Sequence, residues 1–200
     1  LNAKTRIRIG MSVERSQAPQ HFTLITYRLG HQITISQALP VLENVGLEVI
    51  SERAFELCPR NSEAVFIQRF LVRSVTGAFI ESKLFDEVFA PGLARILEGC
   101  EEDDALNVLL LSAGLNVRSI ALLRSYAAFL NQITPFISKA FILETLAALP
   151  NVAQRLWQLF NVRFNPDHQR SIAERDADFK ELLCQFIESL RTVSDLTRDR

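Results

Sequence analysis

The stretch "HQITISQALPVLENVGLEVISER" (His31–Arg53) predicts a short helix that leads directly into a strand. Ser36 is a suitable N-cap, and apolar residues then recur at helical spacing. Pro40 sits early, in or just beyond the first turn, where a missing N–H is tolerated. Gly46 provides a C′ residue, and the alternating pattern after it is typical of a strand.

The residues on either side of this stretch extend the pattern to strand, helix, strand, strand, helix. His21–Gly30 is rich in β-branched and aromatic residues and ends at a glycine. Leu47–Leu57 and Glu63–Ser74 are separated by a turn-like segment and predict an antiparallel hairpin. Glu81–Gly99 has helical periodicity, which Pro91–Gly92 should kink or interrupt. This order predicts an α+β fold with helices on one face of an antiparallel sheet.

The distribution of strand-like and helix-like patterns predicts three regions along the chain. Residues 1–20 read as a strand remnant, "TRIRIGMSVE", followed by a linker. Residues 21–100 form the α+β module, and residues 101–200 form an all-α helical domain.

Capping signals divide the helical region into segments. Asp103 or Asp104 can cap the first segment, and Asn116 can cap the next one, which runs to Ile133. Thr134–Pro135 pairs an N-cap with a proline at the first helical position, so a helix is predicted to begin there. Pro150 separates off the next helical segment, "NVAQRLWQLFNVRF", which Asn165–Pro166 should end.

Two apolar stripes in this region predict surfaces that pack against something else. Trp157, Phe160 and Phe164 are spaced as one face of a helix, which is core or interface more often than a ligand site. The long charged helix near the C-terminus carries a second stripe, made of Ile172, Phe179, Leu182, Leu183, Phe186, Ile187, Leu190 and Val193. We expect part of this apolar surface to contact a catalytic domain or a second subunit.

Composition excludes several classes of partner. The formal net charge of −1 provides no basic footprint for nucleic acid, and no apolar run reaches the length of a membrane span. The three cysteines are widely spaced, which predicts a reducing, cytoplasmic setting rather than a disulfide framework. The chain begins with Leu rather than Met, which suggests a piece of a longer protein.

Among motifs for catalysis, cofactors and metals, the sequence offers one loop as a candidate ligand site. No two of the seven glycines are close enough for a dinucleotide or triphosphate cradle, and no histidine or cysteine spacing fits a metal. The acidic "CEEDD" segment reads as a solvated linker. His31 follows Leu29 and Gly30 at a strand end, where small ligands can bind, although an exposed loop histidine is the simpler interpretation. We therefore predict no catalytic, cofactor-binding or metal-binding residue.

Three stretches of the sequence carry a family signature. They are "YRLGHQITISQALPVLENVGLEVISERAFEL" (Tyr27–Leu57), "EEDDALNVLLLSAGLNVRSIALLRSYAAFLNQI" (Glu101–Ile133), and "LWQLFNVRFNP" (Leu156–Pro166) together with the closing "LRTVSDLTRDR". The residues that carry the signature are Ser36, Pro40, Glu43, Asn44, Gly46, Glu52, Arg53, Asp104, Asn107, Arg118, Arg124 and Tyr126. With these residues, the chain resembles the large, bacterial-type NAD-specific glutamate dehydrogenases.

The resemblance implies an ACT-like module followed by a helical connector, ahead of a catalytic core that this chain does not contain. It implies a cytoplasmic, homo-oligomeric parent enzyme that uses NAD to deaminate L-glutamate oxidatively to 2-oxoglutarate and ammonia. The partners it implies are the enzyme's own catalytic domain, other subunits, and an amino-acid effector bound at the loop Leu29, Gly30 and His31. A free-standing ACT-type module that binds an amino acid or a protein is the alternative.

Overall fold

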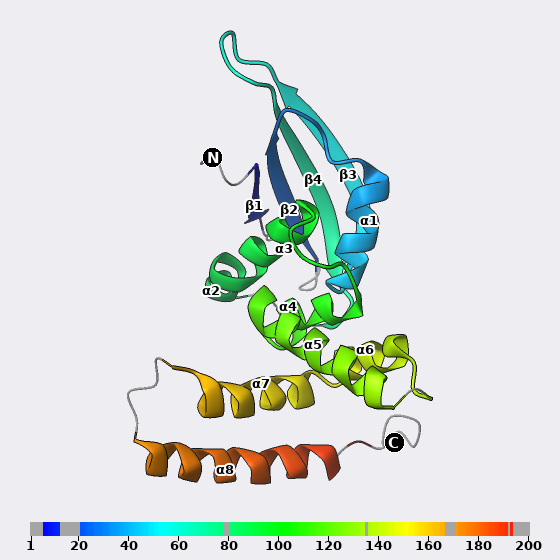
Figure 1. The fold of residues 1–200 in the computed structure, drawn as a ribbon. Coiled ribbons are helices and arrows are strands. Elements are labelled where there is room, and N and C mark those ends of the chain that lie inside the picture. Colours follow the sequence, from blue (N-terminus) through cyan, green and yellow to red (C-terminus); the bar gives the residue numbers. More distant parts are fainter. Residues whose placement is uncertain are drawn as a thin grey trace. The chain divides into compact units, whose positions relative to one another are not determined.

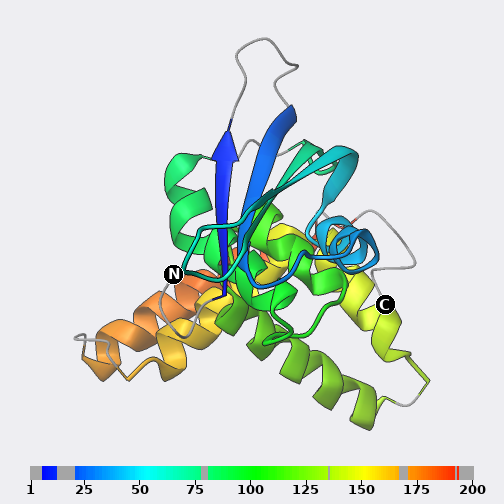
Figure 2. The same cartoon turned by 90° about the horizontal axis from the view of Figure 1, so that it is seen from above.

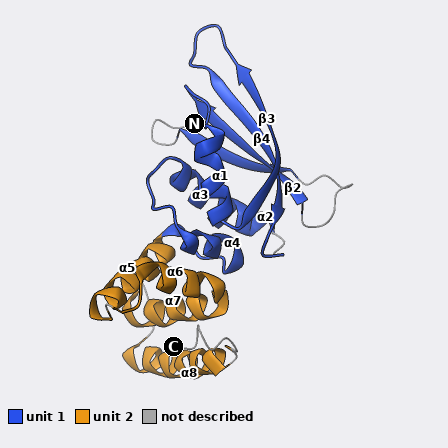
Figure 3. Ribbon diagram, turned by 90° about the vertical axis from the view of Figure 1, so that its right-hand side faces the viewer, with its two compact units in different colours: residues 1–117 blue, residues 118–200 orange. Residues whose placement is uncertain are grey.

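The computed structural model describes residues 6–12, 21–77, 81–134, 136–166, 171–191 and 193. The chain divides into two compact units, residues 1–117 and residues 118–200, which are coloured separately in Figure 3. The first unit combines a sheet with helices, whereas the described part of the second is helical. The predicted α+β fold followed by an all-α region is confirmed.

The first unit contains a four-stranded antiparallel sheet with the strand order β1-β2-β4-β3 (Figure 1). The strands are β1 (Ile7–Ser12), β2 (His21–Leu29), β3 (Leu47–Leu57) and β4 (Val65–Ser74). Because β2 and β3 both pair antiparallel to β4, they run in the same direction with one strand between them. The helix α1 (Ile35–Asn44) makes the crossover, and β3 and β4 form the predicted hairpin.

β1 is an edge strand of the same sheet. It pairs with β2 over its whole length, from Ile7 opposite Arg28 to Ser12 opposite Thr23, and the two strands lie side by side in Figure 2. The carboxylate of Glu98 fixes its start, because Glu98 Oε1 accepts hydrogen bonds from the Ile7 amide at 2.9 Å and from the neighbouring Arg6 amide at 2.8 Å. The predicted strand within residues 1–20 therefore completes the sheet, and the linker predicted after it lies outside the described residues.

α1 begins two residues earlier than predicted. Its N-cap is Thr34 rather than Ser36, and the Thr34 amide donates to Oε1 of Gln37 at 3.3 Å. The extended backbone of Thr34 allows this capping box to form. Pro40 consequently lies inside the helix, not in its first turn. Its ring is exposed, so the helix loses one internal hydrogen bond without a clash in the core.

The helical segment after the sheet is irregular just ahead of its proline. α2 (Ser82–Leu84) passes into a π-helical turn, η1 (Phe85–Phe89), and then into α3 (Ala90–Leu97). Pro91 stands in the first turn of α3, where a missing N–H is tolerated. The interruption predicted at Pro91–Gly92 therefore occurs one turn earlier, as a wider helical turn.

The core of the first unit lies between the sheet and the helices on one of its faces, which are α1 and α3 (Figure 3). Its largest fully buried side chains come from every layer, and they include Leu24, Leu42, Phe70, Phe89, Leu93, Leu106, Leu109 and Leu110. The last three belong to a short segment after α3, namely η2 (Ala105–Val108) and α4 (Leu109–Ser112). Asp104 caps η2 by accepting from the Leu106 amide at 3.0 Å, as predicted.

Two glycines allow the segment from η2 to Val117 to pack closely on the sheet and helices. A Cβ added at Gly92 would lie 2.7 Å from Cδ2 of Leu110 and 3.3 Å from Cγ1 of Val117. A Cβ added at Gly46 would lie 3.0 Å from Cγ2 of Val108. Gly46 also has φ +84°, a conformation that only glycine adopts without strain.

The second unit consists of α5 (Val117–Ile133, which begins at the boundary), α6 (Lys139–Ala148), α7 (Pro150–Phe164) and α8 (Ile172–Arg191). α7 begins at Pro150, one residue before the predicted segment, and it ends at Asn165, as predicted.

The start predicted for α6 at Thr134–Pro135 is wrong. The N-cap is Ser138, whose hydroxyl accepts from the Phe141 amide at 3.2 Å. The Thr134 hydroxyl instead donates to the Leu130 carbonyl at 2.6 Å and so closes the preceding helix, while Pro135 lies outside the described residues.

We expect the substitution Gly46→Ala to destabilise the first unit more than Gly99→Ala does. Both glycines have positive φ, but nothing lies within 4 Å of a Cβ at Gly99. Gly99→Ala therefore measures the backbone strain alone, about 1 kcal/mol, whereas Gly46→Ala adds a clash with Val108. Urea denaturation of the two variants gives the difference in unfolding free energy. Equal losses would show that the close approach at Gly46 contributes nothing.

Candidate functional site

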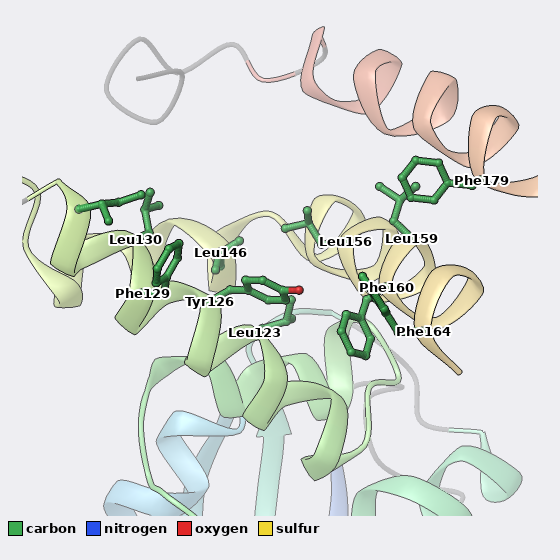
Figure 4. Close-up of a pocket in the computed structure, with 11 residues that line it drawn as sticks. Leu123, Tyr126, Phe129, Leu130, Leu146, Leu156, Leu159, Phe160, Phe164 and Phe179 are labelled. Carbon is green, nitrogen blue, oxygen red and sulfur yellow. The ribbon is translucent and has the colours of Figure 1, made fainter. Parts of the chain in front are cut away.

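An apolar groove in the second unit is the strongest candidate site among the residues that the structure describes. Its cavity volume is about 430 Å³. Figure 4 shows the side chains of α5 and α7 facing each other, with Phe179 reaching in from α8. The lining residues are Leu123, Tyr126, Phe129, Leu130, Ile133, Leu146, Leu156, Leu159, Phe160, Phe164 and Phe179.

α5 contributes to the groove because it has two apolar faces. One face is buried and includes Ile120, Leu123 and Ala127. The other places Tyr126, Phe129, Leu130 and Ile133 at the spacing i, i+3, i+4 and i+7, and all four are exposed. The sequence shows this second apolar stripe. It does not show which of the two stripes is buried, so the second stripe could not be identified as the exposed one.

Aromatic contacts join α7 to α5 within the groove. The ring of Phe160 meets that of Tyr126 edge-on at 6.3 Å between centroids, and it lies 4.9 Å from that of Phe164. Trp157 stacks on Phe160 at 6.1 Å. Edge and offset ring contacts of this kind add to the burial of apolar area. The stripe predicted from Trp157, Phe160 and Phe164 therefore has an internal partner, but Phe164 remains 61% exposed.

Several polar contacts join α8 to α7. The Arg175 guanidinium donates through Nε to the Val162 carbonyl at 3.0 Å. Nη1 of Arg163 lies 2.6 Å from Oδ1 of Asp176, and the same guanidinium stands 5.7 Å from the centroid of the Phe179 ring. These contacts hold Phe179 at the edge of the groove.

The groove and its surroundings present apolar side chains to solvent. No residue of α8 is buried, and its predicted stripe is only half-covered, with Ile187 46% exposed. Phe129 is 58% exposed and Ile133 is 60% exposed. Its lining offers one polar group, the Tyr126 hydroxyl, so the groove is suited to contact with another apolar surface.

The predicted effector loop lies between β2 and α1, and much of its backbone is already hydrogen-bonded. The Gly30 amide donates to the Ala64 carbonyl at 2.9 Å. The buried side chain of Gln68 accepts from the Ile33 amide and donates to the Ile33 carbonyl, both at 2.9 Å. Leu29 is half-buried, whereas His31 is exposed.

Two of the predicted signature residues, Asn44 and Asn107, share a polar contact with Asp103 in the first unit. Oδ1 of Asp103 accepts from Nδ2 of Asn44, at the end of α1, at 3.0 Å. It also accepts from Nδ2 of Asn107 in η2 at 3.2 Å, and Asn107 donates to the Glu102 carbonyl at 3.1 Å. Asn107 is almost fully buried, so its amide needs these acceptors. The missed member is Asp103, which pattern reasoning offered only as an alternative cap.

The remaining signature residues are dispersed. Glu52 accepts from Nε2 of the buried Gln68 at 3.0 Å, and Tyr126 lines the groove. Arg124 is buried within the second unit. The others lie on exposed or half-exposed helix and strand surfaces, apart from Gly46 and Asp104, which were described above: Ser36, Pro40, Glu43, Arg53 and Arg118.

Metal ligands, membrane-spanning helices and cysteines remain to be considered in the part of the chain that the structure describes. No three His, Cys, Asp or Glu residues there could hold a metal ion, and no described helix is long and apolar enough to cross a membrane. The three cysteines are free and exposed. A hydrogen bond to Glu56 raises the pKa of Cys58, which lowers the fraction of reactive thiolate at neutral pH.

We expect Phe129→Ser to weaken the binding of a fluorescent dye that reports exposed apolar surface. Phe129 lines the groove and is 58% exposed, so its removal takes away groove surface with little loss of packing. The control is Ile172→Ser, which removes an even more exposed apolar side chain outside the groove lining. Fluorescence titration with 8-anilinonaphthalene-1-sulfonate measures the effect. Equal weakening by both substitutions would show that the dye does not distinguish the groove.

Comparison with known proteins identifies both parts of the chain. Residues 7–84 match the model of the glutamate dehydrogenase ACT3 domain, and residues 101–166 match that of glutamate dehydrogenase helical motif 3.

Relatives named NAD-specific glutamate dehydrogenase occur in three bacteria. That of Pseudomonas aeruginosa is 29% identical over 92% of this chain, that of Halomonas elongata 32% over 87%, and that of Mycobacterium tuberculosis 30% over 74%. The chain spans 9–11% of the length of these relatives. The predicted resemblance is confirmed: the chain matches the ACT3 domain and helical motif 3 of glutamate dehydrogenases and is similar to a fragment of the large NAD-specific enzymes.

Proposed function

We propose that this chain is a non-catalytic regulatory and assembly region of an NAD-specific glutamate dehydrogenase. The parent enzyme deaminates L-glutamate oxidatively to 2-oxoglutarate and ammonia, and it binds NAD outside this chain. The observation that carries the assembly role is the open apolar groove between α5, α6, α7 and α8, which offers contact surface and no reacting group.

The composition of the groove supports contact with protein. Its lining combines a tyrosine and four phenylalanines with aliphatic residues, and aromatic residues are enriched at the buried centre of protein interfaces. Soluble monomers seldom expose apolar patches of this kind without a partner. The partner we propose is the enzyme's own catalytic domain or another subunit of a homo-oligomer.

Side-chain contacts in the first unit support a scaffold role for the signature residues. Asn44, Asp103 and Asn107 interact with one another, and Glu52 interacts with the buried Gln68. Side chains engaged in this way maintain the packing of helices on a sheet. A substrate-binding role would require some of their polar atoms to point into a cavity.

We expect the chain alone to show no glutamate-dependent reduction of NAD⁺. None of its glycines is spaced for a dinucleotide cradle. Absorbance at the NADH band, with the purified chain, L-glutamate and NAD⁺, measures this. A commercial glutamate dehydrogenase in the same buffer is the positive control. Turnover that co-purifies with the chain would contradict the proposal that this region is non-catalytic.

The alternative is a free-standing ACT-type module that binds an amino acid at the loop of Leu29, Gly30 and His31. One feature of the loop favours this alternative. Gly30 has φ +88° and no side chain, so a ligand can approach its backbone closely. The amides of Gly30 and Ile33 are already engaged, so a ligand would depend on His31 and the backbone beside it.

Calorimetric titration of the chain with the amino acids distinguishes these roles. On the scaffold proposal we expect neither heat of binding nor a shift in Tm. If an amino acid does bind, His31→Ala should weaken it, whereas the same substitution at the remote His21, which stands at the start of β2, should not. Binding lost in His31→Ala alone would favour the amino-acid-binding alternative.

A further inference from the structure

The turn between α5 and α6 presents one aromatic side chain almost entirely to solvent. Phe136 is 84% exposed, the highest value for a large apolar side chain in the part of the chain that the structure describes. It lies outside the lining of the groove. Because the burial of a phenylalanine removes a large apolar area from water, Phe136 is suited to anchor a contact with a partner.

Hydrogen bonds tie this turn to the end of α5. The Ile137 amide donates to the Thr134 carbonyl at 3.0 Å. Nδ2 of Asn131, which belongs to α5, donates to the Ile137 carbonyl at 2.7 Å. The Thr134 hydroxyl in turn donates to the Leu130 carbonyl at 2.6 Å. Phe136 therefore stands on a fixed turn, so a partner that binds it does not first have to order the chain.

The apolar groove begins close to this turn. Ile133 lines the groove and precedes Phe136 by three residues. The volume of about 430 Å³ is ample for one aromatic ring, since an apolar cavity of about 150 Å³ already binds benzene. Apart from the Tyr126 hydroxyl the lining is apolar, and Figure 4 shows its side chains on α5 and α7 facing each other. One unit thus carries an exposed ring and an open site of the chemistry that a ring requires.

The sequence around Phe136 is uncharged over a long stretch. Residues 125–138, which include the second half of α5, contain no acidic or basic side chain. At the Phe179 end of the groove, the Arg163 guanidinium is paired with the Asp176 carboxylate. When a surface meets its own copy, every charge on it meets or approaches a like charge, which is unfavourable. An uncharged surface avoids this cost and is compatible with itself.

We propose that two copies of this chain bind each other by inserting Phe136 of each copy into the apolar groove of the other. The proposal rests on the assembly role proposed above, and it names the partner and the contact. A two-fold contact joins the same patch of both copies, so each copy must supply both the inserted ring and the site that receives it. Phe136 and the groove, with Ile133 between them, meet this requirement. The fixed turn holds Phe136 outside its own groove, which leaves the groove open to the other copy.

Analytical ultracentrifugation of the whole chain over a range of concentrations measures the association. We expect a monomer–dimer equilibrium. Phe136→Ser should weaken the dimer about a hundredfold, because each dimer loses two inserted rings and each ring contributes about tenfold. The matched control is Ile172→Ser, which removes a 79% exposed apolar side chain outside the groove lining and should leave the dimer unchanged.

A mixing experiment separates this reciprocal insertion from a general apolar contact. Phe129→Glu places a charge in the groove and leaves Phe136 intact, whereas Phe136→Ser leaves the groove intact. Each variant alone should fail to dimerise. Their mixture restores one of the two insertions, so we expect a heterodimer about tenfold weaker than the dimer of the unchanged chain. Energy transfer between donor-labelled and acceptor-labelled chains detects it, and circular dichroism confirms that each variant folds.

Three outcomes would overturn the proposal. The chain could remain monomeric up to about 1 mM, or it could dimerise without any association in the mixture of the two variants. It could also form assemblies that grow beyond the dimer, which would indicate a head-to-tail contact.

The dye titration with Phe129→Ser and Ile172→Ser distinguishes a failure of this proposal from a failure of the assembly role. A monomeric chain whose groove still binds the dye would exclude the second copy as the partner and leave the groove open to the catalytic domain. A monomeric chain in which the dye does not distinguish the groove would contradict both proposals.

Discussion

The structure of the first unit depends on the close approach of a short helical segment to the backbone at two glycines. η2 and α4 place Val108 against Gly46, and Leu110 against Gly92. Neither contact leaves room for a side chain on the glycine, and Gly46 also needs its positive φ to end α1. The first residues matched to helical motif 3 therefore complete the core of the ACT3 domain.

Polar contacts reinforce this packing where the two family segments meet. Asp103 connects Asn44 of the ACT3 segment with Asn107 of helical motif 3 through one carboxylate oxygen. The two family matches leave residues 85–100 between them, whereas the compact units divide at 117 and 118. Helical motif 3 thus contributes residues to both units.

The groove of the second unit sets the physics of the contact proposed for it. Its lining is made of apolar side chains, so binding there would depend on the removal of apolar area from water and only weakly on salt. A surface of this kind is suited to hold other parts of an enzyme in position, in keeping with the proposed scaffold role.

The sequence by itself determined the order of elements, because periodicity, glycines and prolines are local signals. It predicted the helix and strand of His31–Arg53, the β3–β4 hairpin and the end of α7 at Asn165. Only the tertiary structure decided which helix stripe lies buried, so the groove beside Tyr126 could not be predicted. It also decided that β1 joins β2 at the edge of the sheet, because local patterns do not determine which strands pair.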